Sequence, residues 1–272
     1  MNILLAVDDS PAAAQALRLI AGYRGERARL ALTALNVQRR APQEGEREVQ
    51  AARAVLAASD LACETAVRIG APARAILEEA SARRADLIVM GTRGRGGLST
   101  LGSVAMRIAH GSHLPTILVK HDARLPAELG LRVRALVPVD GSDHALKAAA
   151  RLASWSEWLS EITADLLYVQ PQLPLVQALT SPKERLVEHW SGRESEQATR
   201  GAIEVLMRNA IQHQVHSVAG DPAQRIAQLA AEMRSDLVVM GTRGLGAAHH
   251  ALLGSVALKV AELSPVPVAL VP

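Results

Sequence analysis

Residues of the types that bind phosphate gather near the C-terminus. Gly241, Gly244 and Gly254 lie close together, and Ser255 directly follows the last of them. Glycine lets the backbone approach an anion closely, and a glycine loop that opens onto a helix offers free N–H groups at the positive end of the helix dipole. A serine there can cap the helix and donate its hydroxyl to phosphate. The spacing therefore predicts a phosphate site between residues 241 and 255.

The elements that would position this loop occur twice in the chain. DLIVMGTRG at residues 86–94 recurs as DLVVMGTRG at 236–244, and ILLAVDDS at 3–10 matches ALVPVDGS at 135–142. Self-similarity of this kind indicates two copies of one unit, and 272 residues are also about the length of two domains. The chain is therefore an internal duplication, with a linker expected near residues 121–130.

Each copy alternates short apolar runs with longer alanine-rich stretches. In the first copy, strands are expected at residues 2–7, 30–37, 65–69, 87–90 and 116–119, and helices at 11–21, 45–58, 73–83 and 103–109. Continuous apolar runs are typical of strands covered on both faces, and the alternation indicates a parallel sheet with helices on both sides. The sequence thus predicts a doubly wound α/β fold in each half.

In such sheets, ligands bind beyond the carboxyl ends of the strands, where the winding reverses. In the second copy, the first strand leads into Asp140 and the fourth leads into the Gly241 turn. The first-strand turns carry aspartate where a dinucleotide fingerprint has glycine, and no Walker A ending GK[ST] is present. Asp8 and Asp140 are each expected to be either a turn former or a ligand contact.

The order of these motifs resembles the universal stress protein family. GxxG, nine further residues and GS at residues 241–255 are similar to the nucleotide loop of its ATP-binding branch, and the resemblance covers nearly the whole chain twice. It implies two five-stranded, Rossmann-like α/β domains, residues 1–122 and 132–272, packed as a pseudo-dimer. It also implies a stress-response protein that acts through nucleotide binding or partner regulation.

The resemblance also implies which residues would hold ATP or another adenine nucleotide, together with Mg²⁺. Asp140 would contact the adenosine part, and the backbone of Val169 would meet the adenine. The phosphates would be held by Gly241, Gly244, Gly254, Ser255 and Val256, and the pocket would also be lined by Pro138 and Arg243. The site is therefore expected in the second domain.

The first copy departs from this pattern. Gly94 and Gly102 enclose seven residues where the second copy has nine. Two residues of extended chain span about 7 Å, so the shorter loop is not expected to follow the same path around a triphosphate. Because Arg93 and Arg95 are present, binding of a smaller or differently placed anion in the first copy stays an alternative. We therefore expect one nucleotide per chain, bound in the second copy.

Composition and charge exclude several classes of function. The net charge is only +3, from 30 basic and 27 acidic residues, and aromatic residues make up 2% with no Phe. Nucleic-acid binding is not expected, because it usually needs a basic patch and stacking rings. No apolar run reaches the length of a membrane span.

Cys63 is the one cysteine of the chain and is expected at a polar helix end. A single cysteine excludes internal disulfides and thiolate-rich zinc sites. We expect a cytoplasmic protein.

No group of residues indicates catalysis. No serine follows a nucleophile-elbow pattern, and His249 and His250 are expected to be solvated loop residues rather than phosphate or metal ligands. The leading hypothesis is a nucleotide-dependent regulator with an unidentified protein partner. A weak ATP-hydrolysing enzyme and an interaction module without nucleotide remain alternatives, and a homodimer of the whole chain stays open.

The second copy carries an insertion between Val169 and Gly220. Three prolines between residues 171 and 182 indicate an extended loop, ahead of a helix expected over 194–212.

The last strand of each copy is an apolar edge, at residues 116–119 and 266–271. Bare apolar edges invite aggregation, so the two strands are expected to pair with each other. Trp155, Trp158 and Trp190 are expected in packing or in the contact between the copies.

Overall fold

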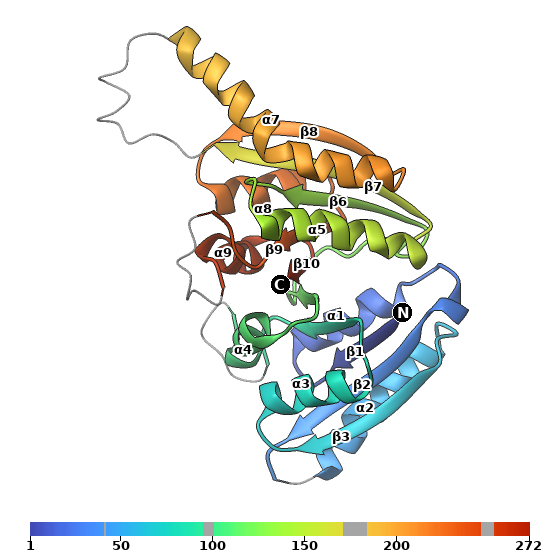
Figure 1. Cartoon of the computed structure of the whole chain (residues 1–272). Coiled ribbons are helices and arrows are strands. Elements are labelled where there is room, and N and C mark those ends of the chain that lie inside the picture. The colour runs from blue at the N-terminus through green and yellow to red at the C-terminus, as the bar shows by residue number, and fades with distance from the viewer. Residues whose placement is uncertain (41, 95–100, 171–183, 246–252) are drawn as a thin grey trace.

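One ten-stranded sheet, with helices on both faces, forms the frame of the molecule. The computed structural model describes residues 1–40, 42–94, 101–170, 184–245 and 253–272, except for the side chains of 184–191. The strand order is β3-β2-β1-β4-β5-β10-β9-β6-β7-β8. The two halves of the chain occupy opposite ends of this sheet (Figure 1). The fold is thus two five-stranded α/β units joined edge to edge, as the sequence predicts.

The first half contains parallel strands and the helices that connect them. In chain order these are β1 (Asn2–Ala6), α1 (Pro11–Ala21), β2 (Ala31–Gln38), α2 (Pro42–Ala57), β3 (Cys63–Ile69), α3 (Pro72–Ala82), β4 (Leu87–Gly91), α4 (Ser103–Gly111) and β5 (Thr116–Val119). The winding reverses between β1 and β4. Each strand and helix predicted here is confirmed, with ends that differ by a few residues. The placement of Cys63 at a helix end is wrong, because Cys63 pairs with Leu32 in the ladder between β3 and β2.

The second half repeats this order. It contains β6 (Arg132–Pro138), α5 (Asp143–Ser154), β7 (Glu161–Gln170), α7 (Glu184–Arg208), β8 (Gln212–Ala219), α8 (Pro222–Glu232), β9 (Leu237–Gly241), α9 (Ser255–Leu263) and β10 (Val268–Val271). The helix expected over 194–212 is wrong at both ends. It begins at Glu184, and it ends at Arg208 because Ala210 takes a left-handed φ of 54° and β8 follows. The loop expected before it falls on residues 171–183, outside the described residues.

Alternate residues of each strand enter two separate cores. In β1, Ile3 and Leu5 share a core with residues of α1 and α2, whereas Leu4 shares one with residues of α3 and α4. In the second half, α5 and α7 cover the first of these faces, and α8 and α9 cover the other. A strand covered on both faces needs apolar side chains at consecutive positions. This requirement produces the continuous apolar runs in the sequence.

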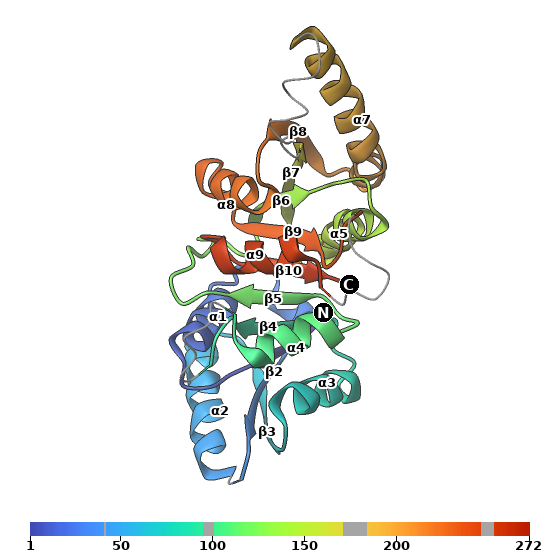
Figure 2. The same cartoon turned by 90° about the vertical axis from the view of Figure 1, so that its left-hand side faces the viewer.

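The two halves join through their last strands. β5 and β10 form an antiparallel ladder and lie side by side at the middle of the sheet (Figure 2). Beside this seam, the Tyr23 hydroxyl donates to the Trp158 carbonyl at 2.9 Å, and the ring of Trp155 meets that of Trp158 edge to face. The predicted pseudo-dimer and the packing role of these two tryptophans are confirmed. The side chain of Trp190 lies outside the described residues.

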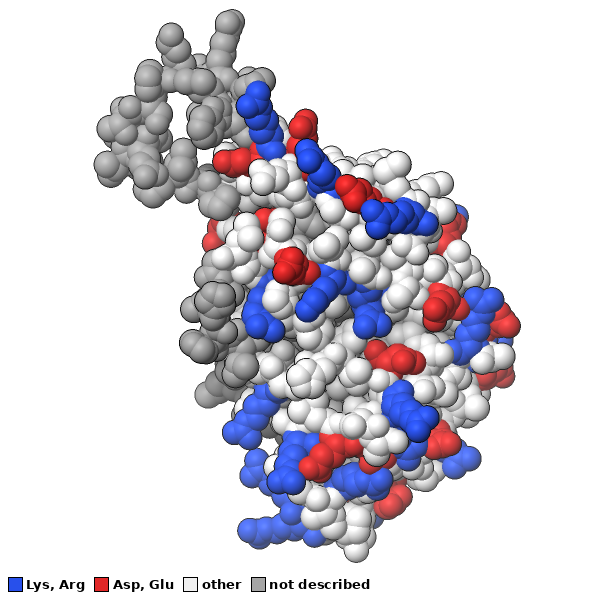
Figure 3. Space-filling model, in the orientation of Figure 1, with Lys and Arg blue, Asp and Glu red and all other residues white. Residues whose placement is uncertain are grey.

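The surface carries charges of both signs. Basic and acidic side chains are interspersed over the face shown in Figure 3. Exposed ion pairs such as Arg74 with Glu78, one helical turn apart, contribute little to stability. Within the described part of the chain, no helix combines the length and the apolar character that crossing a bilayer requires.

Candidate functional site

Asp140 ties together the two turns at the carboxyl ends of β6 and β9. Its Oδ1 accepts a hydrogen bond from the Ser142 N–H at 3.0 Å, and its Oδ2 accepts one from the Leu245 N–H at 3.0 Å. The Ser142 hydroxyl accepts a further bond, from the Ala145 N–H at 3.2 Å, and so caps α5. Asp140 therefore forms the turn, as one of the two sequence hypotheses holds, and it does so beside the loop that leads to α9.

Gly244 packs directly against the Asp140 carboxylate. A Cβ atom at Gly244 would overlap Asp140 Oδ2. Any side chain there would displace the carboxylate or break its hydrogen bond to the Leu245 N–H. The glycine spacing that predicts a ligand loop thus also reflects a contact inside the protein.

Gly254 connects the far end of the loop to both β9 and α9. Its N–H donates to the Thr242 carbonyl at 2.7 Å, and its own carbonyl accepts the first helical bond, from the Leu258 N–H at 3.0 Å. Its φ of −70° suits any residue, but a Cβ atom would stand 3.3 Å from the Thr242 oxygen. The N–H groups of Ser255 and Val256 precede the first helical bond, and no described side chain caps the helix. These groups are placed to meet an anion.

Ser255 lacks its predicted capping role, and Gly241 has a packing role in the structure. Ser255 does not cap α9, because Gly254 occupies the cap position and Ser255 is the exposed first residue of the helix. Gly241 is buried at the end of β9, where an added Cβ would lie 2.7 Å from the His144 backbone in α5. Gly91 at the end of β4 meets α1 in the same way. Gly241 thus permits the close approach of strand and helix behind the loop.

The end of β7 exposes backbone groups beyond its neighbour. β6 ends at Pro138, opposite Leu167, whereas β7 continues to Gln170. The Leu167 carbonyl accepts a bond from the Val139 N–H at 2.9 Å. Backbone groups two residues apart in a parallel strand point to the same side. The N–H and C=O of Val169 therefore project past the end of β6, beyond Pro138.

Arg243 brings positive charge to the turn after β9. Its side chain is exposed, and its charge acts on His144 in the first turn of α5. Burial lowers the pKa of His144, and the positive charges of Arg243 and Lys147 lower it further. The sequence gives no signal for this contact, because a single histidine after a helix cap is usually a surface residue.

The first half holds the same frame around its shorter loop. Asp8 Oδ1 accepts a hydrogen bond from the Ser10 N–H at 3.0 Å, and a Cβ at Gly94 would lie 2.9 Å from Asp8 Oδ2. The Gly102 N–H donates to the Thr92 carbonyl at 2.8 Å. Both ends of the loop are therefore held alike in the two halves.

The difference between the two loops falls within their central segments. Residues 95–100 and 246–252 lie outside the described residues, and with them Arg95, His249 and His250. A different path for the shorter loop therefore stays a prediction, as do the solvated positions of the two histidines.

The second strands of the two halves end differently. Asn36 in β2 is 2% exposed, donates from Nδ2 to the Val7 carbonyl at 2.8 Å, and accepts a bond from Gln38 Nε2 at 2.9 Å. In β7 the corresponding residue is Tyr168, which is half-buried and donates to Glu194 Oε2 at 3.3 Å. In the first half, the Asn36 amide thus occupies the Val7 carbonyl, which follows β1. The second half has no amide side chain at the corresponding position.

Both halves match one known family. The sequence model of the universal stress protein family matches residues 1–120 and 133–272. The chain belongs to the universal stress protein family. A universal stress protein from Thermus aquaticus is 36% identical over 137 residues, which are 50% of this chain and 96% of that protein.

Solved structures agree on the fold. A universal stress protein from Archaeoglobus fulgidus, 22% identical, covers 99% of this chain and 97% of its own with a TM-score of 0.70, which shows the fold alone. A universal stress protein solved in complex with cAMP is 24% identical and covers 52% of this chain and 96% of its own. Its TM-score is 0.36.

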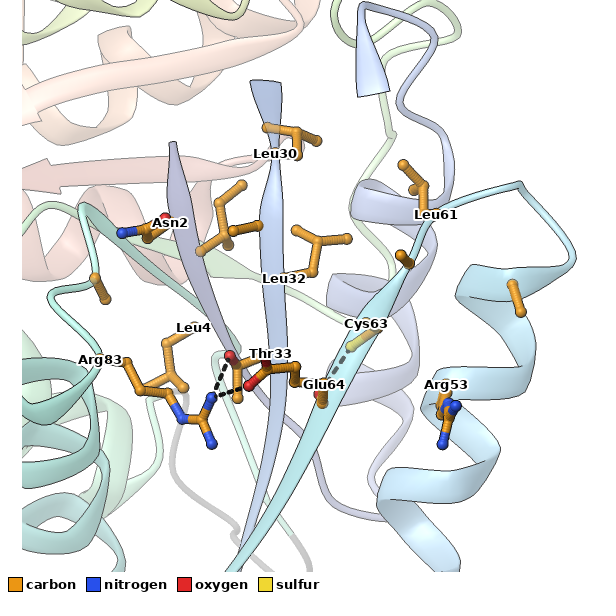
Figure 4. Close-up of a pocket in the computed structure, with 15 residues that line it drawn as sticks. Asn2, Leu4, Leu30, Leu32, Thr33, Arg53, Leu61, Cys63, Glu64 and Arg83 are labelled. Carbon is orange, nitrogen blue, oxygen red and sulfur yellow. Dashed lines mark hydrogen bonds and ion pairs between the residues drawn. The ribbon is translucent and has the colours of Figure 1, made fainter. Parts of the chain in front are cut away.

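The present chain also has a cavity of about 630 Å³ in its first half (Figure 4). The cavity lies near the start of β1, β2 and β3, at the end of the strands opposite to the carboxyl ends. Its lining includes Leu32, on the α1 and α2 face of the sheet, and Leu4, on the other face. Its Arg83 is already bonded to Thr33 and Glu64. The cavity is lined by residues of the first half alone and is therefore separate from the loop at Gly254.

Proposed function

We propose that the second domain, residues 132–272, binds ATP or another adenine nucleotide, and that occupancy regulates contact with a partner protein in the cytoplasm. The carrying observation is that Gly254 leads into a helix start that no described side chain caps, beside the close contact of Gly244 with Asp140. Phosphate binding is favoured by free N–H groups at a helix start, by glycine backbone that a ligand can approach closely, and by a nearby arginine.

In this proposal the phosphates lie against the start of α9. Gly254, Ser255 and Val256 contribute backbone at the positive end of the helix dipole, and the Ser255 hydroxyl, free of a capping role, is a further donor. Gly244 and Arg243 face them from the turn after β9. Arg243 supplies a charge-assisted contact to a phosphate oxygen.

The adenosine part lies over the ends of β6 and β7. Asp140 keeps acceptor capacity for a ribose hydroxyl, because a carboxylate has more acceptor sites than the two bonds it already accepts. The Val169 backbone meets the adenine beyond Pro138, and Gly241 supports the turn from behind. Within the described residues, no three His, Cys, Asp or Glu side chains are grouped for a metal, so Mg²⁺ would arrive with the phosphates.

The first domain, residues 1–122, serves in this proposal as a structural mate. Its loop is shorter, and Asn36 already bonds the carbonyl that follows β1. Gly141 takes a left-handed φ of 84°, whereas Asp9 at the matching place does not, so the first turns also differ in backbone path. These differences support binding in the second domain alone.

Leu245 links occupancy to a partner in this proposal. Its side chain is 72% exposed, and its N–H is bonded to Asp140 Oδ2 at 3.0 Å. A ribose hydroxyl that bonds to a spare acceptor site of the same carboxylate acts on the group that holds this N–H, so nucleotide binding changes how an exposed apolar side chain is held. A ligand shifts an equilibrium only through such a difference in contacts.

The test is mass spectrometry of nucleotide released from the freshly purified full-length protein, followed by titration with ATP and Mg²⁺. Adenine nucleotide in the released fraction, or saturable binding of added ATP, is the expected result. No nucleotide in either experiment would favour the interaction module instead. Steady conversion of bound ATP to ADP, absent in Gly254→Val, would favour the weak ATP-hydrolysing enzyme.

A further inference from the structure

The ten-stranded sheet ends in β3 on one side and in β8 on the other (Figure 2). At the end of β8, the Gly220 N–H donates to the Gln170 carbonyl of β7 at 3.0 Å. Because backbone groups two residues apart in a strand point to the same side, the N–H and C=O of His213, Val215 and Ser217 point away from β7. No group in the described part of the chain bonds them. β8 therefore offers an unpaired edge to a further strand.

Charged side chains protect the opposite edge, β3. The Arg68 guanidinium donates to the Val67 carbonyl at 3.1 Å and pairs with Glu79 at 2.7 Å. Charges on an edge strand are a common protection against pairing with another chain. In β8 the residue that matches Arg68 is Val218, and the strand, QHQVHSVA at 212–219, contains no Lys, Arg, Asp or Glu. The edge of β8 lacks this protection.

The side of α7 that lies above this edge is apolar. An added Cβ at Gly201 would lie 3.3 Å from Leu146 of α5. At about 3.6 residues per turn, Ile203 and Met207 lie on the other side of the helix, away from α5 and toward the outside of the sheet. Met207 is 65% exposed, and Val215, on the sheet face that α7 covers, is 44% exposed. A strand added to β8 would bury these side chains.

The first half has different residues at these places. Asp60 and Ala210, with φ of 56° and 54°, mark the same turn after α2 and after α7. Counted from this turn, the matching residues of the first half are Arg53, Ala57 and Thr65, and the Arg53 side chain is exposed. The two copies of one unit thus differ at their outer edges. The second presents unpaired backbone and apolar side chains where the first presents charged, small or polar side chains.

We infer that the edge of β8 binds the same edge of a second copy of this chain, and that the two molecules form a symmetric dimer through antiparallel β8 strands. This inference goes beyond the proposed function and does not depend on nucleotide. A two-fold axis at Val215 lets that residue exchange both N–H···O bonds with the partner's Val215, and lets His213 exchange them with the partner's Ser217. Because β8 contains no Lys, Arg, Asp or Glu, the new ladder places no like charges of these residues opposite each other.

The charges on α7 favour a second copy as the occupant. Exposed residues alternate in sign along the helix, in the order Glu196, Arg200, Glu204 and Arg208. α7 runs back over β8, and the three strand residues before Val215 span about 10 Å, which is about seven residues of helix. Val215 therefore lies under the turn between Arg200 and Glu204. A two-fold axis there brings Glu196 to the partner's Arg208 and Arg200 to the partner's Glu204, so the ladder and the charges share one axis.

The test is analytical ultracentrifugation of the full-length protein without nucleotide, at concentrations from about 1 μM to about 1 mM. Val215→Pro removes an outward N–H and leaves the ladder to β7, because proline is tolerated at such edge positions. Thr65→Pro makes the same change in β3 and is the matched control. Wild type and Thr65→Pro should dimerise, and Val215→Pro should stay monomeric.

Two further changes act through side chains alone and decide the matter if circular dichroism shows that Val215→Pro is unfolded. Met207→Arg places a charge in the apolar contact and should raise the dimer Kd by at least about tenfold. Arg200→Glu opposes glutamates across the axis and should raise the dimer Kd several-fold, up to about tenfold. Adding Glu204→Arg to Arg200→Glu should restore the wild-type Kd, which is expected only if the partner is a second copy.

A monomeric wild type at every concentration would overturn this inference. So would a dimer that Val215→Pro and Thr65→Pro weaken equally, a dimer that Met207→Arg leaves unchanged, or a charge reversal that Glu204→Arg does not restore. ATP binding by a monomeric protein would leave the proposed function standing, and a dimer without ATP binding would leave this inference standing.

Discussion

Gly254 and Gly102 form a matched pair that separates the folding cost of a side chain from its effect on binding. Each caps the helix after the loop, and each N–H donates to a threonine carbonyl, at 2.7 Å from Gly254 and 2.8 Å from Gly102. An alanine Cβ would stand 3.3 Å from the Thr242 oxygen in one case and 3.2 Å from the Thr92 oxygen in the other. Because these contacts match, Gly254→Ala and Gly102→Ala should destabilise the fold equally.

The two substitutions should differ in their effect on nucleotide affinity. Alanine is a poorer cap than glycine by roughly 1 kcal/mol, and the added contact is only slightly tight, so each variant should lose about 1–2 kcal/mol of unfolding free energy. At Gly254, the methyl group would also push phosphate away from a backbone N–H. A hydrogen bond to a charged group contributes roughly 1.5–3 kcal/mol, which is about 10- to 150-fold in Kd. Gly102→Ala should change Kd by less than about twofold, because distant sites act independently.

Urea unfolding followed by circular dichroism measures the first quantity, and calorimetric titration with ATP and Mg²⁺ measures the second. Both use the full-length protein. The reasoning is refuted if Gly102→Ala weakens ATP binding as much as Gly254→Ala does. It is also refuted if Gly254→Ala lowers stability as expected while its Kd stays within about twofold of wild type.

Residues 1–122 expressed alone should dimerise or aggregate, because β5 loses its partner β10; a stable monomer in sedimentation would argue against the importance of the seam. Tyr23→Phe removes a hydrogen bond between the two halves and should lower the free energy of unfolding by about 1 kcal/mol; an unchanged urea midpoint would contradict this. Burial raises the pKa of Asp165, but hydrogen bonds from Arg134 and His216 outweigh burial and leave that pKa lowered. The stability from this carboxylate is therefore present above its unfolded pKa of about 3.9 and is lost as the pH falls through the folded pKa. In Asp165→Asn, the urea midpoint should therefore change less with pH below about pH 4 than it does in wild type. A pH dependence as steep as in wild type would show that Asp165 is not its source.

The duplication made most of the fold predictable. A sheet covered on both faces imposes continuous apolar runs on its strands, and each copy supports the assignment of the other. The start of α7 at Glu184 could not be predicted in this way, because the insertion has no counterpart in the first copy. Its prolines favoured a loop, yet a proline just before a helix does not prevent it. The position of Cys63 was predicted wrongly because β3 begins where its pairing with β2 begins. The residues around Cys63 give no sign of this pairing in the sequence.

The positions of the candidate site residues were easier to predict than their roles. A glycine looks the same in sequence whether it makes room for a ligand, for the Asp140 carboxylate at Gly244, or for α5 at Gly241. The cap at Gly254 depends on a bond to Thr242 across the loop.

The number of nucleotides per chain tests the central claim most directly. Native mass spectrometry of the full-length protein, titrated with ATP and Mg²⁺, counts them. Binding in the second domain alone predicts a single ATP per chain at saturation, retained in Gly102→Ala and weakened in Gly254→Ala. Two equal ATP adducts per chain, or none at saturating concentration, would contradict it.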